Sequence, residues 1–394
     1  MTFPERFSQL PEYAFPRLRA LLDGHQPGSD PVMMSIGEPK HAFPDWVSDV
    51  VAAHAREFGK YPPNEGSPEL LNAIAGWISR RYGVEVALDR QIMALNGTRE
   101  GLFNACLALC PEKTSSGAQP AVLMPNPFYQ VYAVAALAVG AEPVYVPATA
   151  ETGFLPDYAA LDAELLDRVE IAYLCSPSNP QGAVASREYL AQVIGLAERH
   201  DFYVFADECY SELYSEDAPP GALQVAKDMG VSPERVLAFN SLSKRSNLAG
   251  LRSGFVAGGP EAIARIKQLR AYAGAPLSLP LQRVAEKIWA DESHVAHNRA
   301  LYVEKYHLAD DIFASVFGYQ SPEAGFFLWL PVADAEAATL KLWQETGVRV
   351  LPGSYLGRAV NGVNPGDGYI RVALVAPREE LQPGLLALRN CLYG

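Results

Sequence analysis

Short runs of consecutive apolar residues recur through the middle of the chain, between residues 121 and 257. Runs of this kind, rich in Val, Ile, Phe and Tyr, are typical of strands that are buried on both faces. Segments with helical spacing of apolar residues, such as Tyr189–His200, lie between several of them. The expected strands are 121–124, 143–146, 171–175, 202–206, 236–239 and 254–257. Strands that alternate with helices predict an α/β fold with a mostly parallel central sheet flanked by helices.

The regions on either side of this pattern have a different character. Upstream, Asp45–Phe58 and Pro68–Tyr82 have helical apolar spacing, and a proline suits the first turn of the second helix. The elements expected downstream are a long helix at 282–313, apolar strands at 325–330 and 369–374, and a helix at 335–346. This mixture predicts a second unit with its own small sheet.

The length of the chain also favours two domains. At 394 residues it exceeds what a single hydrophobic core usually supports. We expect a large domain at residues 46–285 and a smaller α+β domain at 286–394. Residues 1–45 should form an N-terminal arm that packs with the small domain.

Composition and charge exclude several classes of protein. A formal net charge of -13 argues against a nucleic-acid partner, since phosphate backbones require a basic face. The longest apolar run, around 131–141, is well short of the ~20 residues of a membrane-spanning helix. Residues 1–22 lack the apolar segment of a secretory signal, so we expect a cytoplasmic protein. No C-x-x-C pair occurs, and His294 and His297 have no ligand pattern around them, so no metal site is expected.

Polar residues follow several of the expected strands, at the edge where ligands gather in parallel α/β sheets. Asp207 comes directly after one apolar run, and Asn179 and Lys244 follow two others. Arg252 lies a short distance beyond the lysine. A single aspartate after a strand is commonly a helix cap, and Asn-Pro commonly begins a turn. The inference therefore depends on all four residues in this order.

Taken together, these residues resemble the class I and II group of fold-type I aminotransferases over nearly the whole chain. The resemblance implies that the cofactor is pyridoxal 5'-phosphate (PLP) and that amino acids and 2-oxo acids are the substrates. Lys244 would hold the cofactor as a Schiff base and then carry a proton for the substrate. Its pKa, ordinarily ~10.4, must be lowered for this chemistry. Asp207 would face the pyridine nitrogen and keep the ring protonated, which makes the ring an electron sink.

The same resemblance assigns the other cofactor contacts. Asn179 and Tyr210 would hydrogen-bond the phenolic oxygen of the ring, and Tyr210 would thereby tune the reactive imine. Tyr129 would stack on the ring, with its neighbour Phe128 as the alternative. A helix that opens at Gly97 can receive a phosphate at its N-terminus. The residues implied for the phosphate are Gly97, Thr98, Arg99, Ser241 and Arg252.

Substrate binding and assembly are also implied. Arg371 matches the arginine that binds the substrate α-carboxylate, a task that suits a planar guanidinium. Gly37 lies in a loop that approaches the same carboxylate, and Asn179 would lie beside it. Tyr61 matches a tyrosine that reaches the phosphate of the partner subunit. The resemblance therefore implies a homodimer with shared active sites.

Four stretches are more distinctive than the family core. They look like bacterial N-succinyldiaminopimelate aminotransferases of lysine biosynthesis, which implies amino exchange between glutamate and an acidic, succinylated partner. A cation besides Arg371 should then meet the distal carboxylates, and Arg245, Lys40 and Arg17 are the candidates. The stretches are 36–41, 126–130, 207–212 and 241–247.

Three other functions share much of this pattern. Another aminotransferase of the same family, or a PLP-dependent C–S β-lyase, would keep the same lysine, aspartate and asparagine. A ligand-sensing module could keep the fold without catalysis. No G-x-G-x-x-G follows any expected strand, which argues against a nicotinamide dehydrogenase.

Overall fold

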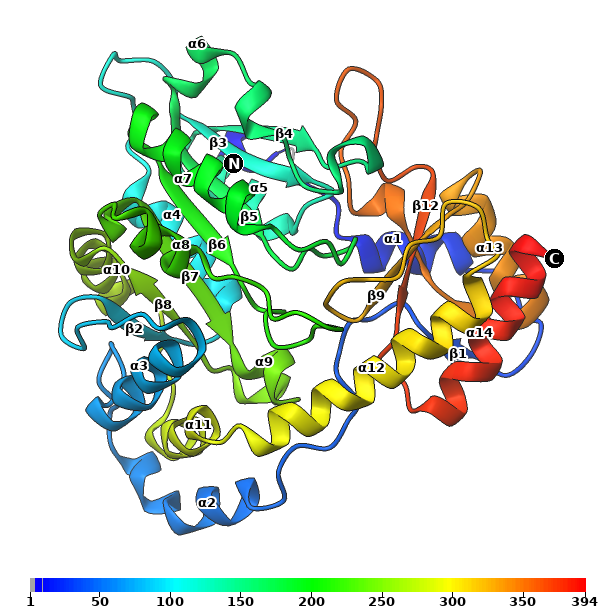
Figure 1. The fold of residues 1–394 in the computed structure, drawn as a ribbon, viewed down its shortest axis with the longest axis horizontal. Coiled ribbons are helices and arrows are strands. Elements are labelled where there is room, and N and C mark those ends of the chain that lie inside the picture. The colour runs from blue at the N-terminus through cyan, green and yellow to red at the C-terminus, as the bar shows by residue number, and fades with distance from the viewer. Residues whose placement is uncertain (1–3, 9) are drawn as a thin grey trace.

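The computed structural model describes residues 4–8 and 10–394, and a seven-stranded sheet forms its larger part (Figure 1). The strand order is β2-β8-β7-β6-β5-β3-β4. Strand β8 runs antiparallel to both of its neighbours, and the other pairs are parallel, which confirms the mostly parallel sheet. The strands are β2 (Ile92–Leu95), β3 (Ala121–Asn126), β4 (Glu142–Pro147), β5 (Val169–Cys175), β6 (Tyr203–Asp207), β7 (Val236–Ser241) and β8 (Gly254–Gly258).

Helices cover both faces of this sheet, as the continuous apolar strands require. Alternate residues of β2 point to opposite faces: Ile92 and Ala94 belong to the core under α3, α8 and α11. Met93 and Leu95 belong to the core under α4, α5 and α10. These helices are α3 (Pro68–Tyr82), α4 (Thr98–Leu109), α5 (Gln130–Ala138), α8 (Ala222–Met229), α10 (Pro260–Ala273) and α11 (Leu279–Ala290), with α6 (Ala163–Leu166) and α7 (Arg187–His200) in a further core that includes residues of β3, β5 and β6.

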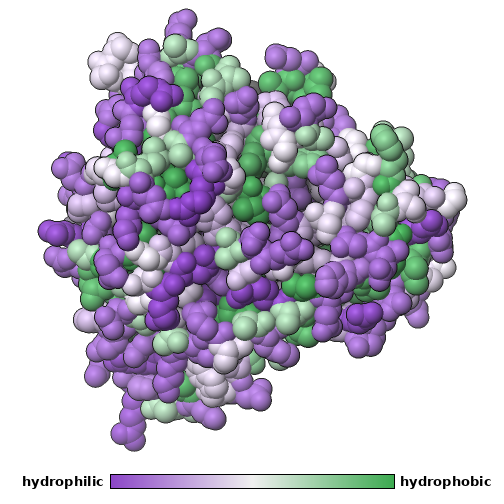
Figure 2. All heavy atoms as spheres, in the orientation of Figure 1, coloured by the Kyte–Doolittle hydropathy of each residue, from purple (hydrophilic) through white to green (hydrophobic). Residues whose placement is uncertain are grey.

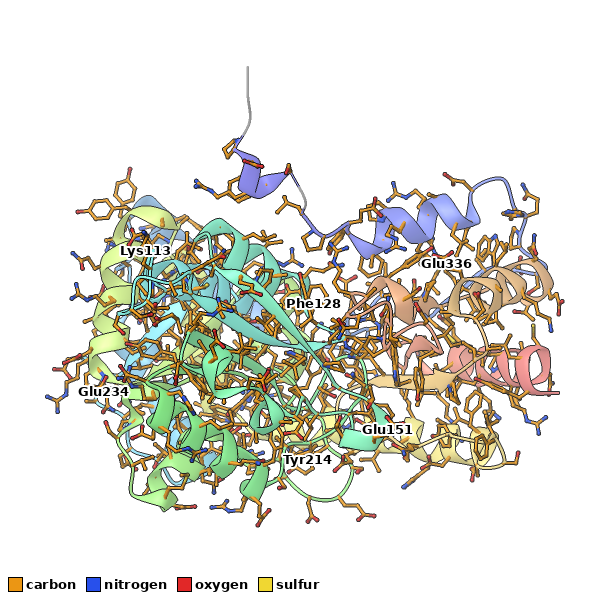
Figure 3. The ribbon with its side chains drawn as sticks, turned by 90° about the horizontal axis from the view of Figure 1, so that it is seen from above. Lys113, Phe128, Glu151, Tyr214, Glu234 and Glu336 are labelled. Carbon is orange, nitrogen blue, oxygen red and sulfur yellow. The ribbon has the colours of Figure 1, made fainter. Side chains whose placement is uncertain are left out.

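The C-terminal part is built around a small antiparallel sheet of order β11-β12-β9. The strands are β9 (Phe327–Pro331), β11 (Leu351–Pro352) and β12 (Tyr369–Ala373), and a separate parallel pair joins β1 (Val32–Met33) to β10 (Val348–Arg349). The helices are α12 (Ser293–Phe313), α13 (Ala335–Thr346) and α14 (Arg378–Tyr393). Helix α1 (Ala14–Leu22) buries Leu18 against Leu351 and Tyr355, and Figure 3 shows it lying above this part of the molecule. The domain limits 46–285 and 286–394 remain predictions.

Two predicted helices are interrupted. The helix expected at 282–313 is two helices, α11 and α12, because Asp291 adopts an extended conformation between them. Its carboxylate accepts hydrogen bonds from the backbone N–H of Ser293 at 2.9 Å and from the hydroxyl at 2.6 Å, which starts a new helix. The helix expected at 45–58 ends early as α2 (Val47–Ala53), and a 3-10 turn at Ala55–Gly59 follows it.

The surface agrees with the composition. Figure 2 shows a face that is mainly hydrophilic, with apolar side chains in separate patches. Over the described ranges, 4–8 and 10–394, no helix combines the length and the apolar character needed to cross a membrane.

Candidate functional site

A cavity of about 330 Å³ lies where the carboxyl ends of β3, β5, β6 and β7 meet the small sheet. Parallel strands present their carboxyl ends at one edge, so the loops that follow them converge there. Phe128, which lines the cavity, lies near the centre of the molecule between the two parts in Figure 3. The predicted residues that line this cavity are Gly37, Thr98, Arg99, Tyr129, Asn179, Asp207, Tyr210, Ser241, Lys244, Arg252 and Arg371.

Gly97 lies just outside this lining and determines its shape. It is the N-cap of α4, and its φ of 84° is one that residues other than glycine rarely adopt. A Cβ atom on Gly97 would lie 2.1 Å from a guanidinium nitrogen of Arg252. Glycine therefore lets a cation lie against a helix N-terminus, and the two together suit a phosphate.

Tyr61, predicted to contact a cofactor phosphate, lies away from the cavity. Its side chain is fully exposed, in the loop between the 3-10 turn Ala55–Gly59 and α3. This position is compatible with a contact to another subunit, and that role remains a prediction.

Lys244 lies on α9 (Leu242–Arg245), the short helix that follows β7. Its Nζ donates to the main-chain carbonyl of Gly37 at 2.5 Å. Burial, together with the positive charges of Arg371 and Arg252, lowers the pKa of Lys244 to about 8. A large share of this amine is therefore neutral at mildly alkaline pH, as the predicted chemistry requires.

This pKa leads to a prediction about the apoprotein. Covalent uptake of PLP should become faster as the pH rises and level off above about pH 8, because only the neutral amine of Lys244 reacts with an aldehyde. The measurement is the rate of the absorbance change on mixing apoprotein with PLP across this pH range. A midpoint near ~10.4, the ordinary value for lysine, would show that the amine is not desolvated.

Asp207 ends β6 and is buried. Its carboxylate accepts a hydrogen bond from the Tyr132 hydroxyl at 2.7 Å and one from the backbone N–H of Cys209 at 3.4 Å. Burial raises the pKa of Asp207, because its two donors are neutral and compensate only part of the lost hydration. A cationic N–H placed in the cavity would stabilise the charged carboxylate.

Tyr132 was not predicted from the sequence to contact Asp207. Its ring stacks on Tyr173, with centroids 4.3 Å apart and an angle of 13° between the rings. It follows Tyr129 by one helical turn on α5, which was the available signal. A tyrosine within an apolar helix is most simply core, so the sequence favoured packing over a role at Asp207.

Arg371 lies on β12 and is held by three parts of the chain. Its guanidinium donates to the Asn179 side-chain oxygen at 3.0 Å and to the Ser35 carbonyl at 2.9 Å, and it lies 4.1 Å from the centre of the Phe327 ring. Its buried Nε finds no hydrogen-bond acceptor within the described residues. Burial lowers its pKa to about 10, so it stays cationic at neutral pH and can bind a carboxylate.

These groups match the functional groups of PLP. Because Gly97 has no side chain, the Arg252 guanidinium lies against the start of α4, and this pairing of a cation with a helix N-terminus suits a phosphate. The buried carboxylate of Asp207 has only neutral donors and would receive a protonated pyridine nitrogen. The amine of Lys244 lines the same cavity and would bind the aldehyde. The residues present therefore fit the cofactor.

Two of the three expected distal cations are wrong. Arg245 is fully buried on the other side of α9, where its guanidinium contacts the faces of Trp77 and Trp289 and pairs with Glu292 at 2.7 Å. Lys40 is exposed and does not line the cavity. Neither side chain lines the cavity in which the substrate carboxylates are expected.

The third candidate lies beside a neighbouring hollow. Arg17 packs over the ring of Tyr355 at 3.8 Å and lies 3.6 Å from the Glu336 carboxylate. Its charge is therefore already paired within the protein. Arg99, whose backbone amide is predicted to meet the cofactor phosphate, presents an exposed side chain in the cavity wall, with Nε donating to the Tyr129 hydroxyl at 2.7 Å. Arg99 is therefore the additional cation that the cavity offers.

Comparisons with known proteins agree with this arrangement. Residues 29–388 match the family "Aminotransferase class I and II". An LL-diaminopimelate aminotransferase of Desulforudis audaxviator is 32% identical, covering 100% of this chain and 99% of the relative, and one of Moorella thermoacetica is 33% identical over 98% and 97%. Solved structures include an aminotransferase of Neisseria meningitidis (TM-score 0.94, 38% identity, 98% of this chain and 99% of that chain) and the aminotransferase AspB of Helicobacter pylori (0.90, 34%, 99% of each). The chain belongs to the class I and II aminotransferases, which depend on PLP.

Proposed function

We propose that this aminotransferase transfers an amino group between glutamate and N-succinyl-2-amino-6-oxopimelate, the 2-oxo acid that corresponds to N-succinyl-LL-diaminopimelate. The observation that carries the proposal is the distribution of charge in the cavity. Arg371 and Arg99 both line it, whereas Asp207 is the only carboxylate lining it among the described residues. A long substrate with a carboxylate at each end and a masked distal amine suits this distribution.

Each proposed residue has one task in the transfer. When bound, PLP withdraws electrons from the bond between the substrate Cα and its hydrogen. Arg371 binds the α-carboxylate and so fixes the Cα atom near Nζ of Lys244. The neutral amine of Lys244 accepts the proton from the substrate Cα, and it would later return a proton to the cofactor carbon C4′. Asp207 keeps a proton on the ring nitrogen, and its burial strengthens that interaction.

Free LL-diaminopimelate is the second candidate, favoured by the names of the two relatives. Its distal end carries an ammonium group as well as a carboxylate. That ammonium would need an anionic partner, and the described lining offers only Asp207, which is proposed for the cofactor. Succinylation removes the positive charge and adds a carboxylate, which is why we place the N-succinyl form first.

A half-reaction screen tests the choice. The holoenzyme is mixed with single amino donors while the cofactor absorbance is followed. Faster conversion with glutamate and N-succinyl-LL-diaminopimelate than with aspartate or aromatic amino acids is the expected result. Faster conversion with free LL-diaminopimelate would replace the first candidate with the second. Release of pyruvate and ammonia from sulfur amino acids would instead indicate a C–S β-lyase.

Arg99→Ala should lower kcat/KM for N-succinyl-LL-diaminopimelate by roughly 10- to 100-fold, the usual cost of losing a charged hydrogen bond. Alanine, which has no distal carboxylate, serves as the control donor and should change little. Arg99→Lys keeps the charge and should recover part of the loss. An equal loss with both donors would mean that Arg99 acts on the cofactor and not on the distal carboxylate.

We also propose that the enzyme is a homodimer in which Tyr61 reaches the partner's cofactor phosphate. The complete exposure of this aromatic side chain, away from its own cavity, supports the proposal. Tyr61→Phe should weaken PLP binding while leaving the dimer intact, as measured by PLP titration and sedimentation.

A further inference from the structure

A buried lysine on α12 lies outside the site described above and has no assigned task. Lys305 is 3% exposed, and burial lowers its pKa to about 8, so it remains mostly protonated at neutral pH. Its Nζ lies 2.7 Å from Nε2 of His41 and donates to the Leu374 carbonyl at 3.0 Å. Burying an ammonium group is costly, so these contacts call for an explanation.

The contacts continue from Lys305 to α9, the short helix that carries Lys244. Nδ1 of His41 lies 2.8 Å from the side-chain oxygen of Asn298, one of the residues that α12 carries. The amide nitrogen of Asn298 points at the main-chain carbonyls of Lys244 and Arg245, at 3.5 Å each. In Figure 1, α12 runs from the large sheet to the C-terminal part, so this series of contacts spans both.

Only one assignment of donors and acceptors satisfies Lys305, His41 and Asn298 together. A protonated lysine can only donate, so Nε2 of His41 must accept and Nδ1 must carry the proton. The Nδ1–H then donates to the oxygen of Asn298, which also accepts from Asn247 at 3.1 Å. The amide of Asn298 is thereby turned toward the Lys244 carbonyl. The charge of Lys305 thus fixes the orientation of the whole series.

The same residues hold the segment that faces the substrate. Gly37, four residues before His41, accepts the hydrogen bond from Nζ of Lys244. A Cβ atom on Gly37 would lie 2.4 Å from the Phe327 ring, so the segment has little freedom there. Its other end is fixed separately, since the backbone N–H of Ala373 donates to the Met34 carbonyl at 2.7 Å.

We infer that Lys305 and His41 are positioning residues for Lys244: through Asn298 and Gly37 they hold both the backbone and the amine of the catalytic lysine. Neither residue lines the cavity. The inference depends only on Lys244 being the catalytic amine and not on the identity of the amino acid. Loss of these contacts should disturb the amine of Lys244 without disturbing substrate binding by Arg371. Arg371 bonds to Ser35, at the end of the segment that the bond from Ala373 fixes independently.

Lys305→Met and His41→Leu test this inference in the holoenzyme with glutamate as donor. Each should lower kcat about tenfold, because a small displacement of the amine slows proton transfer. The KM for glutamate should stay within about twofold, because Arg371 keeps its contacts. The double variant should lose no more than the more affected single variant, because the two residues act in series.

Tyr302→Phe is the matched control. Tyr302 lies on the same helix, its ring is 4.6 Å from that of His41, and its buried hydroxyl has no hydrogen-bond partner within the described residues. Removing that hydroxyl should leave kcat unchanged. His41 is only half-buried, so His41→Leu should fold and can test the inference even if Lys305→Met does not fold. Unchanged kcat in folded, PLP-loaded His41→Leu would overturn the inference, as would additive losses in the double variant or a rise in KM alone.

Discussion

Lys244→Ala should lower kcat/KM for every amino donor by about 10⁴-fold or more, the upper range for loss of a general acid–base. The variant loses both the amine that binds the cofactor aldehyde and the amine that moves the proton. PLP should still bind through its phosphate and ring, without a covalent link. The measurements are steady-state kinetics and the mass of the protein after reduction with borohydride.

A second lysine provides the control for this substitution. Lys267 on α10 also has a pKa lowered by burial, and its amine donates to the Asp89 carbonyl at 2.8 Å, away from the cavity. Lys267→Ala should keep full activity and covalent PLP. If Lys244→Ala retained normal turnover, the assignment of the whole site would be wrong.

Asp207→Asn should lower kcat by about 10³-fold, in the range seen when one preorganised electrostatic contact is removed. A neutral amide cannot keep a proton on the ring nitrogen, so the ring loses its capacity as an electron sink. Tyr132→Phe removes one hydrogen bond from a neutral donor while leaving the charge of Asp207 in place, and it should cost only about fivefold. Both variants are compared by single-turnover kinetics with saturating glutamate.

The ratio between these two variants is the informative result. Equal losses would mean that Tyr132, and not the charge on Asp207, controls the ring. A normal rate in Asp207→Asn would contradict the proposed role of the carboxylate. Retention of PLP in each variant, measured by absorbance, separates a slower reaction from an empty site.

The strands of the large sheet were predictable because they are buried on both faces and leave continuous apolar runs. Strand β2 escaped notice because it has only 4 residues and no flanking pattern. The long helix at 282–313 was predicted as one because apolar spacing continues across Asp291. Its interruption depends on a side-chain hydrogen bond to Ser293, which a count of apolar positions does not register.

The candidate site, too, was predictable only in part from the sequence. The residues that follow the strands were identifiable because topology brings those loops to one edge. Arg245 was misplaced because nearness to Lys244 in sequence says nothing about direction. Successive residues of a helix point about 100° apart, so one side chain enters the cavity and the next turns toward α11. Tyr132 and Lys305 act through other residues, and such roles require coordinates.

The close approach of Gly97 and Arg252 also restricts how this protein can change over evolution. A side chain at position 97 would occupy the space of the guanidinium and would have to accept a φ of 84°. A single substitution there displaces Arg252 and strains the start of α4 together. Divergence at this corner therefore requires at least two coordinated changes, one at each position, with the loss of a proposed phosphate ligand in between.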